Sequence, residues 1–114
     1  MCDFKIIKKT TNGLLLFCQK ANGFQLSFNN LFLNLSRYEL NSFIDYLEKM
    51  DVDYWEQEYK NSIYSKKMPI PTVQSNLIIL IDRHELLELK ILLTNVHENT
   101  LLTSKLINYA LYLN

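Results

Sequence analysis

The chain has 114 residues, with 12 basic and 12 acidic side chains that cancel to no net charge, and 48% of its residues are hydrophobic. This length predicts a single domain, residues 1–114, with enough apolar side chains to form a core. The neutral balance argues against nucleic acid or an anionic membrane surface as partner. No apolar run approaches the roughly 18 residues that a membrane span needs.

Short runs of strand-forming residues predict a four-stranded antiparallel meander over the first 35 residues. The pairs Asn12-Gly13 and Asn22-Gly23 are expected to form its first two turns, because type I′ turns need positive φ at both central residues. A third turn is expected directly after residue 28.

The second and third strands carry different patterns. The run LLLF at residues 14–17 does not alternate, so we expect this strand to be covered on both faces. In the next strand Phe24, Leu26 and Phe28 alternate with polar residues, which predicts one buried face and one wet face.

Capping signals mark the helices. Ser36 is expected to cap the first helix, with Glu39 completing a capping box, and Asp53 followed by Glu56 suggests a second cap. Helices are predicted near residues 36–50, 53–63, 82–96 and 99–113.

One phrase occurs twice. NLFLNLSRYEL at residues 30–40 returns as NLIILIDRHEL at residues 76–86, a shift of 46 residues that superposes turn, strand, cap and helix. This agreement predicts a pseudo-duplicated fold with two strand–strand–helix units, about 24–50 and 70–96.

The resulting fold class is α+β. We expect a mainly antiparallel sheet of about six strands, formed by the N-terminal meander and a second hairpin within residues 70–81, with three to four helices. Pro69 and Pro71 lack N–H groups on the same side of an extended strand, so this strand should lie at an edge or enter the sheet only after Pro71.

The helix near 82–96 is apolar over more than half of its circumference, which is too wide for one sheet to cover. The C-terminal helix is expected to pack over it. If that cover is incomplete, a homodimer would form through the outer face of residues 84–95 and the C-terminal residues Leu102, Leu106, Tyr109 and Leu113.

The sequence offers little support for a metal site or a catalytic nucleophile. Cys2, Cys18, His84 and His97 show neither CxxC nor HxxxH spacing. After loss of the initiator methionine Cys2 would be an N-terminal nucleophile, but no oxyanion hole or substrate pocket accompanies it. We expect no metal, no cofactor and no catalytic residue.

Two cysteines in a chain without a signal peptide are expected to be reduced thiols. The N-terminal MCDFKIIKK has charges where a signal peptide has its apolar stretch, so we expect a cytoplasmic location.

An aromatic and basic cluster is the feature most typical of a binding site. It is interpreted as closure of the core, as a protein-binding patch with Trp and Tyr anchors, or as a stacking platform for single-stranded nucleic acid. Its members are Tyr54, Trp55, Tyr59, Lys60, Tyr64, Lys66 and Lys67.

Several segments, namely the N-terminal MC, the hairpin FQLSFNNLFLNL, YWEQEY and IPTVQSNLIILI, resemble a family of small uncharacterised proteins from Bacteroidetes. The resemblance spans nearly the whole chain. It implies a bacterial cytoplasmic setting and no known activity, cofactor or catalytic residue.

These observations predict a non-enzymatic interaction or regulatory module. The alternative is a small-molecule binding protein, or an unrecognised enzyme, with a pocket between the sheet and the helices.

Overall fold

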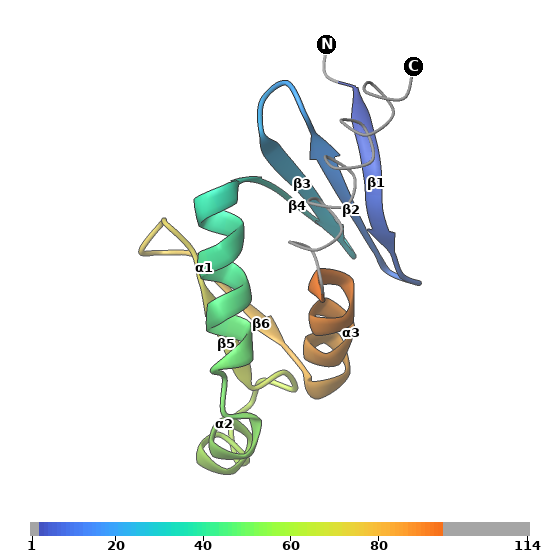
Figure 1. The fold of residues 1–114 in the computed structure, drawn as a ribbon. Coiled ribbons are helices and arrows are strands. Elements are labelled where there is room, and N and C mark those ends of the chain that lie inside the picture. Colours follow the sequence, from blue (N-terminus) through green and yellow to red (C-terminus); the bar gives the residue numbers. More distant parts are fainter. Residues whose placement is uncertain (1–2, 95–114) are drawn as a thin grey trace, which may run out of the picture.

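Four antiparallel strands, hydrogen-bonded in the order β1-β2-β3-β4, form the larger sheet of the computed structural model, which describes residues 3–94 (Figure 1). The strands are β1 Phe4–Lys9, β2 Gly13–Cys18, β3 Gly23–Phe28 and β4 Leu31–Ser36. They are followed by helix α1 Arg37–Glu48, helix α2 Val52–Glu58, strands β5 Met68–Pro71 and β6 Ile78–Ile81, and helix α3 Arg83–Leu93. The predicted α+β class is confirmed.

The six predicted strands are present and divide into two sheets. β5 and β6 form a separate two-stranded antiparallel hairpin, in which Pro69 pairs with Leu80 and Pro71 with Ile78. Neither proline can donate a backbone hydrogen bond, so β5 cannot be fully bonded along its other side. This is the edge position that the two prolines predict.

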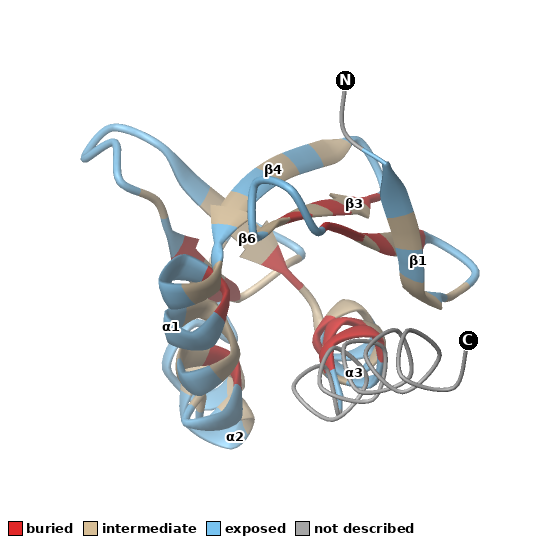
Figure 2. Cartoon of the chain, turned by 45° about the horizontal axis from the view of Figure 1, so that its top comes forward, coloured by how far each residue is buried: buried red, intermediate tan, exposed pale blue. Residues whose placement is uncertain are grey.

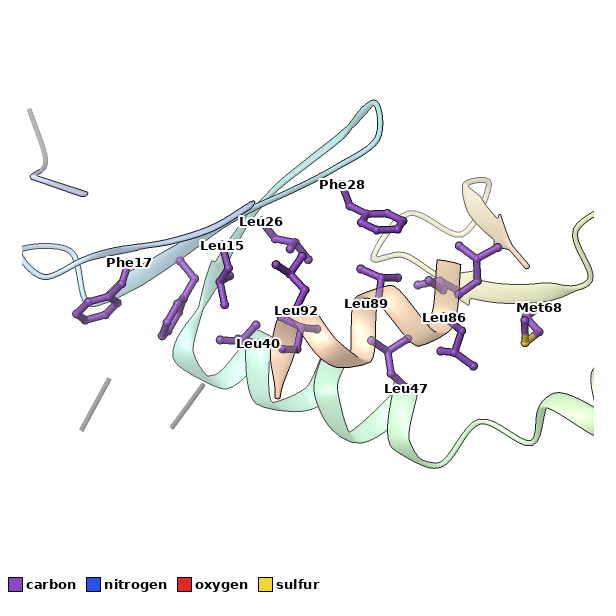
Figure 3. Packing of buried hydrophobic residues seen from close by; sticks show 14 residues of the cluster. Leu15, Phe17, Leu26, Phe28, Leu40, Leu47, Met68, Leu86, Leu89 and Leu92 are labelled. Carbon is purple, nitrogen blue, oxygen red and sulfur yellow. The ribbon is translucent and has the colours of Figure 1, made fainter. Parts of the chain in front are cut away.

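The core lies between the four-stranded sheet, the hairpin and the helices α1 and α3 (Figure 3). The alternation predicted for β3 is confirmed, because Phe24, Leu26 and Phe28 are all buried. Figure 2 shows both helices on the same side of the sheet. On the other side of β2 Leu14 and Leu16 are half-buried and Cys18 is buried, so the predicted cover of both faces of this strand is partly present among the described residues.

The two glycines do not have the role predicted for them. The turn residues with positive φ are Asn22, at 50°, and Asn29, at 53°, whereas neither glycine has positive φ. Gly13 is instead the first residue of β2, where a Cβ atom would lie 2.6 Å from Cδ2 of Leu92. This glycine is required by the close approach of α3, a contact that turn statistics do not register.

Helix α1 forms as predicted. The Oγ of Ser36 accepts the Glu39 backbone N–H at 3.1 Å, and the Glu39 carboxylate accepts the Ser36 N–H at 2.9 Å. Hydrogen bonding of the Glu39 carboxylate to the backbone N–H of Ser36, and then to the Ser36 side chain, lowers the pKa of Glu39. Leu40 and Leu47 are buried on the inner face, as the apolar spacing of this helix predicts.

Helix α2 differs from its prediction. Its N-cap is Asp51, whose side chain accepts the Tyr54 N–H at 3.1 Å, and the expected cap Asp53 lies inside the first turn. The helix ends at Glu58 rather than near residue 63. Asn61 and Ser62 follow, and such side chains bond to nearby backbone groups in competition with a helix.

Helix α3 repeats the arrangement of α1. Asp82 and Glu85 form a second capping box, so both predicted hairpin–helix units show the same order of elements and the same cap. Of its apolar residues Leu86, Leu89, Leu92 and Leu93 are buried, whereas Leu87 and Ile91 remain 52% and 55% exposed. The apolar surface of α3 is wider than its covered face, as its sequence predicts.

Several predictions extend beyond the described residues. The helix near 99–113 and the dimer contacts at Leu102, Leu106, Tyr109 and Leu113 lie outside them, as do Cys2 and His97. Cys18 is disulfide-bonded, so the expectation of a reduced thiol is wrong for this residue.

One carboxylate joins α3 to the turn between β1 and β2. Glu88 accepts hydrogen bonds from the Thr10 hydroxyl at 2.7 Å, the Asn12 N–H at 2.8 Å and the Asn12 side-chain amide at 2.8 Å. These bonds, first that of Thr10, lower the pKa of Glu88 below its ordinary value of 4.5. The ionised form therefore stabilises the folded chain.

We expect Glu88→Gln to change how stability depends on pH. A carboxylate with a depressed folded-state pKa stabilises above its unfolded pKa, and the effect is lost as pH falls through the folded value. The variant should melt at a lower temperature than the natural chain at neutral pH, and the two curves should converge as the pH falls below 4.5 and through the lowered pKa of Glu88. Thermal melts across this range measure it, and parallel profiles for the two proteins would contradict it.

Candidate interaction surface

Helix α2 places an aromatic group at the end of the molecule opposite the four-stranded sheet (Figure 1). Asp51 starts the helix, and the turn spacing then places Trp55 on its inner side, where the ring is half-buried and packs against the core. The core-closure interpretation therefore holds for Trp55.

The ring of Trp55 contacts the rings of Tyr54, on the same helix, and of Tyr59, which caps its C-terminus. The rings of Trp55 and Tyr59 are stacked with 5.6 Å between centroids and 12° between planes. Tyr54 meets Trp55 edge-on at 5.3 Å and 75°. Such pairs favour one relative placement of the rings, so the anchored indole limits the freedom of both tyrosines.

The tyrosines themselves are exposed. Tyr54 is 53% and Tyr59 45% exposed, and Tyr64 on the following loop is 59% exposed. Ile63, the last residue of the predicted helix 53–63, lies beyond the end of α2 and is 91% exposed. We call Tyr54, Trp55, Tyr59, Ile63 and Tyr64 the aromatic surface.

The lysines of the predicted cluster have different roles. Lys66 forms an ion pair with Glu85 at 2.9 Å, and its hydrogen bond to that carboxylate raises the pKa of Lys66. Lys67 donates to the carbonyl oxygens of Ser62, at 3.1 Å, and of Tyr64. Lys60 is exposed. Two of the three lysines thus hold the loop that follows α2.

The acidic residues of α2 also have structural partners. Besides the N-cap Asp51, Asp53 binds Nη2 of Arg83 at 2.9 Å, and Glu56 accepts from Nε of the same arginine at 3.0 Å. These bonds raise the pKa of Arg83 and join α2 to the start of α3. The acidic run therefore serves as cap and tether, in keeping with its place at a helix N-terminus.

Within residues 3–94, no three His, Cys, Asp or Glu side chains come together as metal ligands. Between the sheet, α1, the hairpin and α3, an apolar gap lined by residues such as Leu33, Phe43 and Ile79 has a volume of about 10 Å³. Ligand pockets usually measure about 300–1,000 Å³. This gap holds no organic ligand.

A family profile described as "Family of unknown function (DUF6686)" matches residues 1–114. The chain belongs to this family. No curated protein and no solved structure matches the chain. The expectation of a family of small uncharacterised single-domain proteins is thereby confirmed, and DUF6686 membership assigns no activity to the aromatic surface.

Two features of this DUF6686 chain were missed by sequence reasoning. The exposure of Ile63 follows from the early end of α2, which Asn61-Ser62 signals. The tether between Arg83 and the acids of α2 joins residues about 30 positions apart, and no local pattern indicates it. None of the helices within the described part of the chain is long and apolar enough to cross a bilayer.

Proposed function

We propose that this protein is a non-enzymatic interaction or regulatory module that binds a partner protein through the aromatic surface. The observation that carries the proposal is the pair of half-exposed tyrosines held against the anchored Trp55. Trp and Tyr are the side chains most enriched among residues that dominate binding energy at protein interfaces.

The anchoring of the rings supports this function energetically. Ordering a side chain at an interface costs free energy, and a ring already held by its neighbours loses less freedom on binding. Ion pairs of Arg83 with Asp53 and Glu56 also link α2 to the start of α3. The surface is therefore preorganised.

Charge favours protein over nucleic acid as the partner. Single-stranded nucleic acid binders combine stacking rings with a positively charged groove. Lys66 pairs with Glu85, Lys67 caps carbonyl groups, and four acids lie within residues 51–58 beside the rings. Such a surface does not provide the positively charged groove that these binders use.

The alternative function is binding of a small molecule, or an unrecognised reaction, between the sheet and the helices. The gap of about 10 Å³ in that region counts against it. A bacterial source and a common origin of the two hairpin–helix units are part of the proposal as well, whereas the expected cytoplasmic location is not. The disulfide at Cys18 counts against a reducing compartment.

The test is affinity capture with matched tyrosine variants. Tagged natural protein, Tyr59→Ala, Tyr54→Ala and Tyr38→Ala are compared by quantitative mass spectrometry of captured proteins. Tyr38 is 80% exposed on α1 and serves as the control. We expect one partner to be lost by at least about tenfold in the α2 variants and kept with Tyr38→Ala, as for anchor residues worth more than ~1.4 kcal/mol.

A partner retained equally by all variants would place the binding site elsewhere on the molecule. Full-length variants with unchanged circular dichroism are used, so that loss of capture reports contact and not unfolding.

A further inference from the structure

The ring of Tyr54 lies among carboxylates. Asp51, the N-cap of α2, accepts the Tyr54 N–H at 3.1 Å and so lies one turn before it. Glu58 is four positions further along the helix than Tyr54, and side chains four apart are neighbours on a helix surface. All three residues are exposed. The exposed ring therefore has one carboxylate on the turn before it and another on the turn after it.

A shallow hollow beside the same ring is also acidic. It is lined by Asp51, Asp53, Tyr54, Glu56 and Gln57. Three of these five residues carry a carboxylate and none carries a positive charge. Tyr54 thus forms one wall of an acidic hollow that is open to solvent.

The negative charge around the ring is only partly balanced. Arg83 pairs with both Asp53 and Glu56, so that one positive charge faces two negative ones. Within the described part of the chain Glu58 forms no ion pair. From the N-cap of α2 to Glu58 the chain has four acids and no base, and Lys60 is the next base. Four acids against these two bases leave an excess of two negative charges.

An aromatic face and a carboxylate one helical turn away attract the same kind of group, a cation. The ring attracts a cation through its quadrupole, and the carboxylate accepts charge-assisted hydrogen bonds from it. An arginine side chain can use both, because its planar guanidinium stacks on a ring while its N–H groups remain free to donate. An acidic segment would be repelled here, and a neutral one would leave the carboxylates unused.

We propose that the partner bound by the aromatic surface presents a basic segment, and that an arginine or lysine of this segment lies over Tyr54 between Asp51 and Glu58. The inference rests on the proposed function, since it assigns the chemistry of the partner at the same surface. Trp55 and Tyr59 contact the apolar parts of the segment. Charge complementarity then selects the partner, and the rings anchor it.

The test uses random peptides that are displayed on phage and selected on the immobilised full chain. Selected peptides should contain arginine and lysine at least about twice as often as the unselected library, because a negative surface favours basic partners. The strongest binder is then labelled with a fluorophore, and its dissociation constant is measured by fluorescence anisotropy. Raising the salt concentration from about 0.05 M to about 0.5 M should weaken its binding, since exposed charges are screened.

Matched variants locate the peptide on the surface. Tyr54→Ala, and Glu58→Gln, which removes a charge at nearly unchanged size, should each weaken binding of this peptide by at least about fivefold. Glu48→Gln removes an exposed acid at the end of α1 in the same way and should leave binding unchanged. Circular dichroism shows that each variant is folded.

The outcomes separate this inference from the proposed function. Peptides without a basic bias that lose binding in Tyr54→Ala and Tyr59→Ala overturn the inference and leave the proposed function standing. Basic peptides that bind both tyrosine variants as tightly as the natural chain contradict both, since the binding site then lies elsewhere. Basic peptides that need Tyr54 but respond neither to Glu58→Gln nor to salt overturn the inference alone, as does a selection that enriches no peptide.

Discussion

Replacing Phe28 by alanine is expected to lower the free energy of unfolding by about 3–5 kcal/mol, the usual cost of removing a buried aromatic ring. Phe28 is 2% exposed and lies between the sheet and α3, near Leu89 (Figure 3). The loss combines the transfer free energy of the ring with the cavity that remains. Urea unfolding followed by circular dichroism measures it.

The control is the phenylalanine four residues away. Phe32 lies across the β3–β4 turn, on the face of the four-stranded sheet that is turned away from the helices, and is 58% exposed. Phe32→Ala should change the free energy of unfolding by less than about 0.5 kcal/mol. Equal losses from the two substitutions would contradict the assignment of Phe28 to the core face and Phe32 to the other.

The two glycines should respond in opposite ways to alanine. At Gly13 the new Cβ would lie 2.6 Å from Cδ2 of Leu92 and 3.2 Å from Cδ1 of Phe28. Leu92 is fully buried and has little room to withdraw, so Gly13→Ala should cost about 1–3 kcal/mol through overpacking. Thermal and urea unfolding measure the loss.

At Gly23 the nearest atom to a new Cβ is 3.6 Å away, and φ is not positive. Gly23→Ala should therefore be neutral or stabilise the chain by about 0.4–1 kcal/mol, since alanine restricts the unfolded state. A larger loss at Gly23 than at Gly13 would show that turn conformation, rather than packing against α3, is what requires glycine.

A double-mutant cycle tests the contact directly. Leu92→Ala alone should cost about 2–5 kcal/mol, because it leaves a cavity where the side chain was. Combined with Gly13→Ala, which places a methyl group beside that space, the loss should be smaller than the sum of the two single losses. Strict additivity would mean that the two positions do not touch.

The sequence alone determined the starts of α1 and α3, where the deciding interactions are local, although the equally local cap of α2 was placed two residues too late. A capping box needs residues only three positions apart, so Ser36 with Glu39 marked the start of α1 correctly. The alternation of β3 identified its buried face, and two prolines identified the edge strand. The repeated phrase indicated two hairpin–helix units with the same cap, because it superposed local signals of each kind.

Only the tertiary structure decided which apolar residues find cover and what several polar residues bind. Leu92 lies so close to Gly13 that a larger residue would clash there. Glu88 accepts hydrogen bonds from the β1–β2 turn, and Arg83 binds acidic residues about 30 positions away. The apolar patterns of β2 and α3 predicted burial on more than one side. They did not identify the residues that would bury those sides. Contacts between residues so far apart depend on how elements pack, and no local spacing encodes that.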